Sequence, residues 1–144
     1  MADWQTFGYP MENDVSAKSV FSKSWFYSWN TTTSEWENTL KSYVMQPFEG
    51  YMTSQYKYEN GMLITFAGNL VQNENHEINL IYNEGDEYTL NLTANSFSAP
   101  IDITKFKPSD FINVEPEIGI QCTGSTEALD TFHINITTEE DIKA

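Results

Sequence analysis

Arginine is absent from this 144-residue chain, and only seven lysines stand against 21 aspartates and glutamates, so the formal net charge is −14. Proteins that bind nucleic acid neutralise phosphates with basic side chains, so this deficit argues against such a role. It also disfavours adsorption to anionic lipid headgroups by charge alone. The acids are scattered along the chain, a pattern that fits either a solvated surface or recognition of a basic partner.

Cysteine is equally scarce. The single Cys122 excludes a disulfide within the chain and a cysteine-cluster metal site. It lies on the same side of an alternating segment as Ile118 and Ile120, so we expect a small, buried apolar residue. The two histidines, His76 and His133, have no spacing that supports a zinc site, and we predict neither a metal nor a cofactor.

Long apolar runs are missing, which excludes a transmembrane helix. The start, "MADWQTFGYP", has no basic region followed by an apolar one, so we expect no signal peptide and a cytoplasmic location at synthesis. Secretion without a cleaved leader stays open. The length indicates a single domain over 1–144, with an N-terminal arm at 1–15 and a flexible tail at 138–144.

One segment carries a helical pattern. Ser34 and Glu37 match a capping box, in which two side chains satisfy helix N-terminal donors reciprocally. After it, Trp36, Leu40, Tyr43 and Val44 fall on one face at helical spacing. Pro47 would end the helix, because proline cannot continue the hydrogen-bond ladder. The sequence therefore predicts one short helix between 34 and 46.

Most of the remaining chain alternates like β-strands. We expect a first strand within 19–29, and Asn60-Gly61 predicts a type I′ hairpin between strands at 51–58 and 62–67. Further strands are expected at 76–82, 87–93, 96–104, 117–123 and 131–137. The inward set, and thus the predicted core, is Phe66, Ile64, Leu80, Leu90, Leu92, Ile118, Ile120, Phe132, Ile134 and Ile136.

The predicted fold class is therefore mainly β with one helix (α+β), a curved antiparallel sheet packed on a short helix; a β-sandwich is the alternative. The segment 62–67 is apolar on both faces, with Met62, Ile64 and Phe66 on one side and Leu63, Thr65 and Ala67 on the other. One helix cannot cover both. The second face needs the N-terminal arm, another sheet layer, a lipid or a partner protein.

Catalytic signatures are lacking. Cys122, Asp130 and His133 are close in sequence, but Cys122 alternates inward while His133 alternates outward. The clusters "NENHE" and "NEGDE" do not have the spacing of a calcium loop and fit polar turns. We therefore expect no enzymatic activity, and no catalytic or metal-binding residue.

Aromatic side chains are the best recognition candidates, because interface energy concentrates in a few aromatic anchors. The predicted binding residues are Trp25, Phe26, Tyr27, Trp29, Leu63, Tyr56 and Tyr58. Burial in the core is the plainer interpretation for strand aromatics.

The segments "SEWENTLKSYVMQP" and "GYMTSQYKYENGMLITFAGNLVQ", with the later alternating strands, resemble the OrfX family, whose members are encoded beside botulinum-type neurotoxins. The resemblance implies a tubular, lipid-binding-like half-module. It also implies a non-toxic accessory protein of the toxin gene cluster, which binds a larger OrfX-type partner and contacts lipid. It carries over no catalytic residue.

Two other functions remain open beside this protein–protein interaction role. An acidic immunity or inhibitor protein would neutralise a basic effector by charge complementarity. A glycan-binding β-sandwich would use aromatic faces against sugars, although no motif specifically supports it.

Overall fold

The computed structural model describes residues 4–39, 43–55, 63–72, 74–87, 89–122 and 130–135. Over these residues the fold is mainly β with one short α-helix, the class that the sequence predicts, and its sheets are antiparallel. The chain divides into two compact units, Met1–Pro100 and Ile101–Ala144. They are described in turn.

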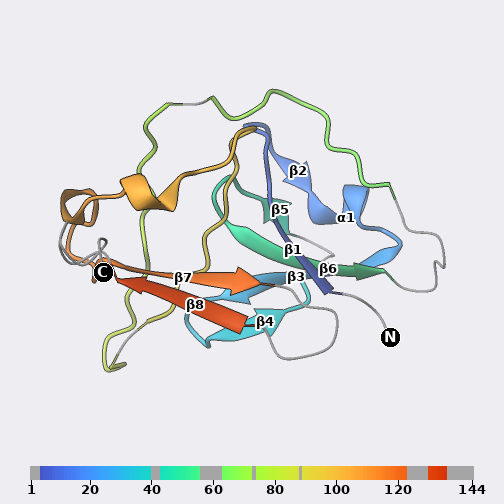
Figure 1. The fold of residues 1–144 in the computed structure, drawn as a ribbon. Coiled ribbons are helices and arrows are strands. Elements are labelled where there is room, and N and C mark those ends of the chain that lie inside the picture. The colour runs from blue at the N-terminus through green and yellow to red at the C-terminus, as the bar shows by residue number, and fades with distance from the viewer. Residues whose placement is uncertain are drawn as a thin grey trace. The chain divides into compact units, whose positions relative to one another are not determined.

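The larger unit is built on a four-stranded sheet (Figure 1). Its strands, in spatial order, are β1 (Trp4–Gly8), β6 (Gly50–Gln55), β3 (Ser24–Asn30) and β4 (Glu35–Glu37). The predicted N-terminal arm thus supplies an edge strand. Neither β1, β6 nor β3 contains a charged residue, so both faces of their sheet are available to apolar and aromatic side chains.

A second, two-stranded sheet pairs β2 (Val15–Ser16) with β5 (Val44–Met45). The helix α1 (Ala17–Val20) follows β2 directly and makes a single turn. It brings Phe21 to the sheet. This connection places one layer of apolar residues over one face of the four strands.

That face is the core. Phe26 on β3 is completely buried, and its ring centroid lies 5.3 Å from that of Tyr51 on β6 and 5.2 Å from that of Phe21. Phe7 on β1 adds a ring 5.2 Å from Phe21. The buried members of this cluster are Tyr9, Met11, Ala17, Phe21, Phe26, Met45 and Tyr51. Because it joins three strands to the helical turn, this aromatic cluster holds the larger unit together.

The predicted helix between 34 and 46 is wrong. Glu35–Glu37 forms β4, Val44–Met45 forms β5, and residues 40–42 lie outside the described part. The Asn30 side chain explains the reversal, since its Oδ1 accepts hydrogen bonds from the backbone N–H groups of Thr32 and Thr33 and turns the chain into a hairpin. Asn30 Nδ2 also donates to Glu37 Oε1 over 2.6 Å, which occupies the expected capping carboxylate. Cross-strand pairing therefore overrides a weak helical preference.

Several predicted strands are also wrong. Residues 63–67, 76–82, 89–93 and 96–104 form no strand in the described structure, and a turn occupies 84–85. The segments 76–82 and 89–93 nevertheless contact each other. The Asn91 side chain donates to the Ile81 carbonyl and accepts from the Ile81 N–H, each over 2.9 Å. A side-chain amide here takes the place of the backbone ladder. The Asn60-Gly61 hairpin lies outside the described residues.

The predicted core is partly correct. Ile64 and Phe66 pack against the buried cluster, and the Phe66 ring lies 5.4 Å from that of Tyr9. Leu80 and Leu90 are exposed, at 42% and 55%, because without a paired strand their alternation does not point into a sheet face. The core therefore covers one side of the doubly apolar segment through Ile64 and Phe66, while Leu63 on the other side is 92% exposed.

The smaller unit contains two 3₁₀ turns, η1 (Ile103–Lys105) and η2 (Pro108–Asp110). Its hairpin pairs β7 (Glu117–Cys122) with β8 (Asp130–Asn135) in antiparallel register, and confirms two predicted strands over these ranges. Asp102 caps η1 by accepting hydrogen bonds from the Thr104 hydroxyl and backbone N–H, which lowers the pKa of the Asp102 carboxyl.

Candidate functional site

All four tryptophans of the chain lie on the sheet face opposite the core. Side chains alternate along a strand, so on β3 the buried Phe26 and Ser28 point to the core and the three remaining aromatics point away. The strand register then assigns the rest of this face. Its members are Trp4 and Thr6 from β1, Met52 and Ser54 from β6, Trp25, Tyr27 and Trp29 from β3, and Trp36 from β4. We call this surface the tryptophan face.

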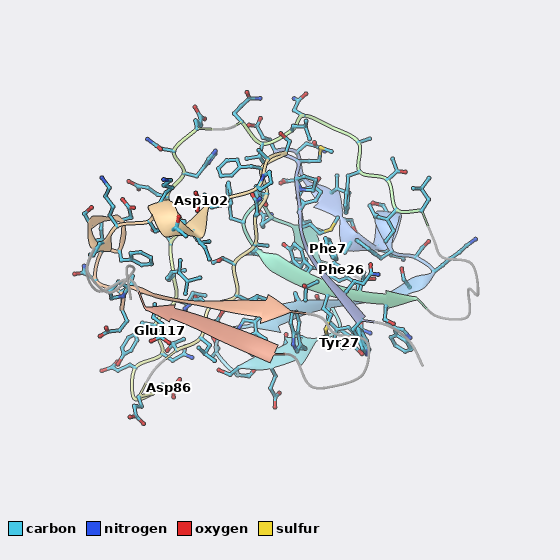
Figure 2. The ribbon with its side chains drawn as sticks, viewed as in Figure 1. Phe7, Phe26, Tyr27, Asp86, Asp102 and Glu117 are labelled. Carbon is cyan, nitrogen blue, oxygen red and sulfur yellow. The ribbon has the colours of Figure 1, made fainter. Side chains whose placement is uncertain are left out.

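The rings of the tryptophan face contact one another across strands. Trp4 meets Tyr27 edge-on with ring centroids 5.3 Å apart, and Trp29 meets Trp36 in the same way at 5.5 Å. Figure 2 shows Phe7 and Phe26 on one side of the strands and Tyr27 on the other. Trp4 and Trp25 keep 40% and 41% of their surface exposed, so large indole surface reaches solvent.

The chain itself covers one half of the tryptophan face. Leu92 lies over Gly50, so closely that a Cβ at position 50 would meet its Cγ at 2.6 Å. Gly8 likewise approaches the Asn95 carbonyl, and the Trp29 Nε1–H donates to the Leu90 carbonyl over 2.9 Å. The segment 90–95 therefore closes the end of the face formed by Gly8, Gly50 and Trp29. The other end, around Trp4, Trp25 and Tyr27, is the exposed half.

Ser54 on β6 lies at the centre of the exposed half. It pairs with Trp4 of β1 on one side and with Trp25 of β3 on the other. It is only 2% exposed, and its hydroxyl has no hydrogen-bond partner in the structure. A buried polar group without a partner costs about 1–3 kcal/mol. The exposed half thus combines two indole rings with one unsatisfied hydroxyl between them.

The structure separates the predicted binding residues into three groups. Trp25, Tyr27 and Trp29 share the tryptophan face, whereas Phe26 belongs to the core, so its assignment to a binding surface is wrong. Leu63 is exposed in a segment that is not part of the sheet. Tyr56 and Tyr58 lie outside the described residues.

Sequence reasoning missed Trp4 and Trp36 as members of the face. Trp4 falls in the predicted arm at 1–15, which shows no clear period, and Trp36 falls in the predicted helix. An Asn followed by threonines between two aromatic stretches was the signal that could have found the β3–β4 hairpin, because Asn side chains favour turns.

A second cluster of polar groups lies at the rim of the core. The hydroxyls of Tyr43 and Tyr51 both donate to Glu49 Oε2, and the Gln46 N–H donates to the Tyr51 hydroxyl over 2.7 Å. Burial is the main reason that the pKa values of both tyrosines are raised above 10.0, and the hydrogen bond to Glu49 adds to it for Tyr43. These contacts hold the loop at 46–49 in place, so we assign them a structural role.

Features that would support chemistry are few. Within the described residues, no group of three or more His, Cys, Asp or Glu side chains could hold a metal ion. An open pocket is lined by Glu74, Asn75, Phe97, Ala99 and Pro100. In the same described part of the chain, no helix has the length and apolar character needed to span a bilayer.

Comparison with known proteins adds no relative. No family model matches the chain, no curated protein matches it, and no solved structure matches it. The candidate function therefore depends on the geometry of the tryptophan face.

Proposed function

We propose that this protein is a non-catalytic interaction protein that binds a partner protein through the exposed half of the tryptophan face. The observation that carries the proposal is the placement of every tryptophan of the chain on the sheet face opposite the core. Tryptophan is enriched among the residues that dominate interface energies, and contiguous exposed apolar patches mark interaction sites.

The contrast in burial supports this surface over the other candidates. Trp4 and Trp25 stay about two-fifths exposed, although the core on the opposite face buries Phe26 and Tyr51 completely. Leu63 is more exposed, but it stands in a segment without sheet neighbours. One face of a sheet presents several rings side by side, which a single exposed leucine cannot do.

The resemblance to the OrfX family is in keeping with this role. It would make the partner a larger OrfX-type protein from the same gene cluster, and it adds lipid as a second kind of contact. Under the proposal the dispersed acids set the association rate and its salt dependence, while the rings supply most of the affinity.

The test is a binding titration with a partner captured by tagged protein from cells that naturally express the chain, and then purified. We expect Trp25→Ala to weaken binding by about 2 kcal/mol, because aromatic anchors at the centre of an interface lose that much or more on truncation. Trp29→Ala should lose less, because Trp29 lies at the end closed by the segment 90–95.

Leu63→Ala is the matched control, since it removes an exposed apolar side chain outside the sheet. Its affinity should equal that of the wild type. Wild-type affinity in both tryptophan variants, together with a steep loss of affinity on adding salt, would instead favour the acidic inhibitor of a basic effector.

A further inference from the structure

The distribution of charge limits the class of partner that the tryptophan face can bind. The strands that form the exposed half, β1, β6 and β3, contain no charged residue, yet the chain as a whole carries a net charge of −14. An uncharged aromatic surface on a strongly acidic protein attracts cations from a distance and repels acidic partners. The strands themselves contain no lysine.

We propose that the exposed half of the tryptophan face binds a cationic segment of the partner protein, whose arginine or lysine side chains stack on the indole rings. This inference rests on the proposed function and specifies the chemistry of the partner. Cations are attracted to the negative face of an aromatic ring, and tryptophan is the strongest such ring. Arginine fits best, because its planar guanidinium stacks on indole and is weakly hydrated.

Trp4 and Trp25 are placed for this contact. They face each other across β6 with Ser54 between them, and both expose about two-fifths of their surface. The edge-on contact of Trp4 with Tyr27 leaves the two rings in different planes, at 80° to each other. A guanidinium that lies on Trp4 also presents N–H donors, and the Ser54 hydroxyl is an acceptor without a partner.

The experiment compares two short acetylated peptides as probes, one alternating arginine with glycine and one alternating citrulline with glycine. Citrulline keeps a planar side chain with N–H donors, but one nitrogen of the guanidinium is replaced by a carbonyl oxygen and the group carries no charge. We expect the wild-type protein to bind the arginine peptide about tenfold more tightly than the citrulline peptide, in keeping with one or two cation–π contacts.

Two variants distinguish stacking on the indole rings from general electrostatic attraction of the peptide to the acidic protein. Trp4→Leu/Trp25→Leu keeps an apolar surface but removes both indoles, and should lose about tenfold in affinity for the arginine peptide. The control neutralises three exposed acids of a turn, Glu84→Gln, Asp86→Asn and Glu87→Gln, and should lose less than the ring variant.

Each other outcome has a definite meaning. Equal binding of both peptides, lost in the ring variant, would overturn the cationic partner and leave the binding role of the face intact. Binding of the arginine peptide that survives the ring variant but falls with the acid variant would show plain polyanion attraction, and would overturn this inference. Binding of the natural partner is measured separately, in the titration with the captured protein. Failure of the proposed function can therefore be told apart from failure of this inference.

Discussion

The two faces of the four-stranded sheet are both aromatic, but only one is closed. On the core face, the Phe26 ring contacts those of Phe7, Phe21 and Tyr51 and has no exposed surface. On the tryptophan face, the segment 90–95 covers one end and leaves Trp4 and Trp25 about two-fifths exposed. Aromatic content by itself therefore does not decide burial. What decides it is whether another part of the chain reaches the face.

The covering segments also differ in kind. The core is covered by α1, β2 and β5, which bring apolar side chains inward from their own backbone-paired elements. The tryptophan face is covered by a stretch that forms no strand. It is held to the backbone at 48–50 by an isolated bridge between Glu49 and Thr93 and by the hydrogen bond from the Ala94 N–H to the Phe48 carbonyl, and two glycines allow its close approach. The first arrangement leaves Phe21, Phe26 and Met45 almost without exposed surface, whereas the second leaves Leu90 55% exposed. Mutations should therefore affect the two faces unequally.

The largest expected effect is on the core face. Phe26→Ala should lower the free energy of unfolding by about 3–5 kcal/mol, because it removes a fully buried ring from contact with several others. Denaturant titration measures it. Leu90→Ala is the control; Leu90 is exposed, so its variant should stay within about 0.5 kcal/mol of wild type. Equal losses in both would contradict the assignment of the two faces.

The second-largest expected loss of stability is at the closed end of the tryptophan face. Gly50→Val should lower the free energy of unfolding by about 1–3 kcal/mol, because the new side chain would occupy the space of Leu92. Met52→Leu conserves volume on the same strand and face, and should cost less than about 1.5 kcal/mol. If Gly50→Val is as stable as wild type by thermal and denaturant unfolding, the segment 90–95 does not cover this end.

The two tyrosines at the rim of the core should make the stability of the fold depend on pH. The folded protein raises the pKa values of Tyr43 and Tyr51, so above pH 10 the unfolded chain releases protons that the folded state keeps. Stability should be complete below about pH 10 and fall as the pH rises further. Tyr51→Phe should cost about 1 kcal/mol at neutral pH, through the lost hydrogen bond to Glu49, and should weaken the alkaline loss.

Unfolding curves of wild type and Tyr51→Phe across the alkaline range provide the measurement. An identical alkaline slope in the two proteins would contradict the role assigned to the Tyr51 hydroxyl. The neighbouring Tyr27 lies on the other face, so Tyr27→Phe serves as the control.

The smallest expected effect is a gain in stability, where the other variants lose stability. Ser54→Ala should leave stability unchanged or raise it by about 1 kcal/mol, because the wild type buries a hydroxyl without a partner. Ser28→Ala is the matched control on the core face: Ser28 is also buried, but its hydroxyl is 2.9 Å from the Thr39 hydroxyl, so its loss should destabilise. A clear destabilisation by Ser54→Ala would mean that its hydroxyl has a partner.

Local patterns in the sequence determined part of this fold. The mainly β class, the strand within 19–29 and the existence of strands at β7 and β8 follow from alternation and β-branched or aromatic content. The inward direction of Ile64 and Phe66 also follows from alternation, even without a strand. The charge of −14 and the scarcity of cysteine limited the classes of function in the same direct way.

Only the tertiary structure decided where the tryptophans lie. Trp36 sits in a segment whose local spacing suits a helix, and it becomes a strand residue because Asn30 turns the chain and Trp29 offers a cross-strand partner. Trp4 joins the same face because β1 pairs with β6, which lies more than 40 residues away in the sequence. Periodicity reports which residues share a side of one segment. It cannot report which segments pair, because that depends on the packing free energy of the whole sheet.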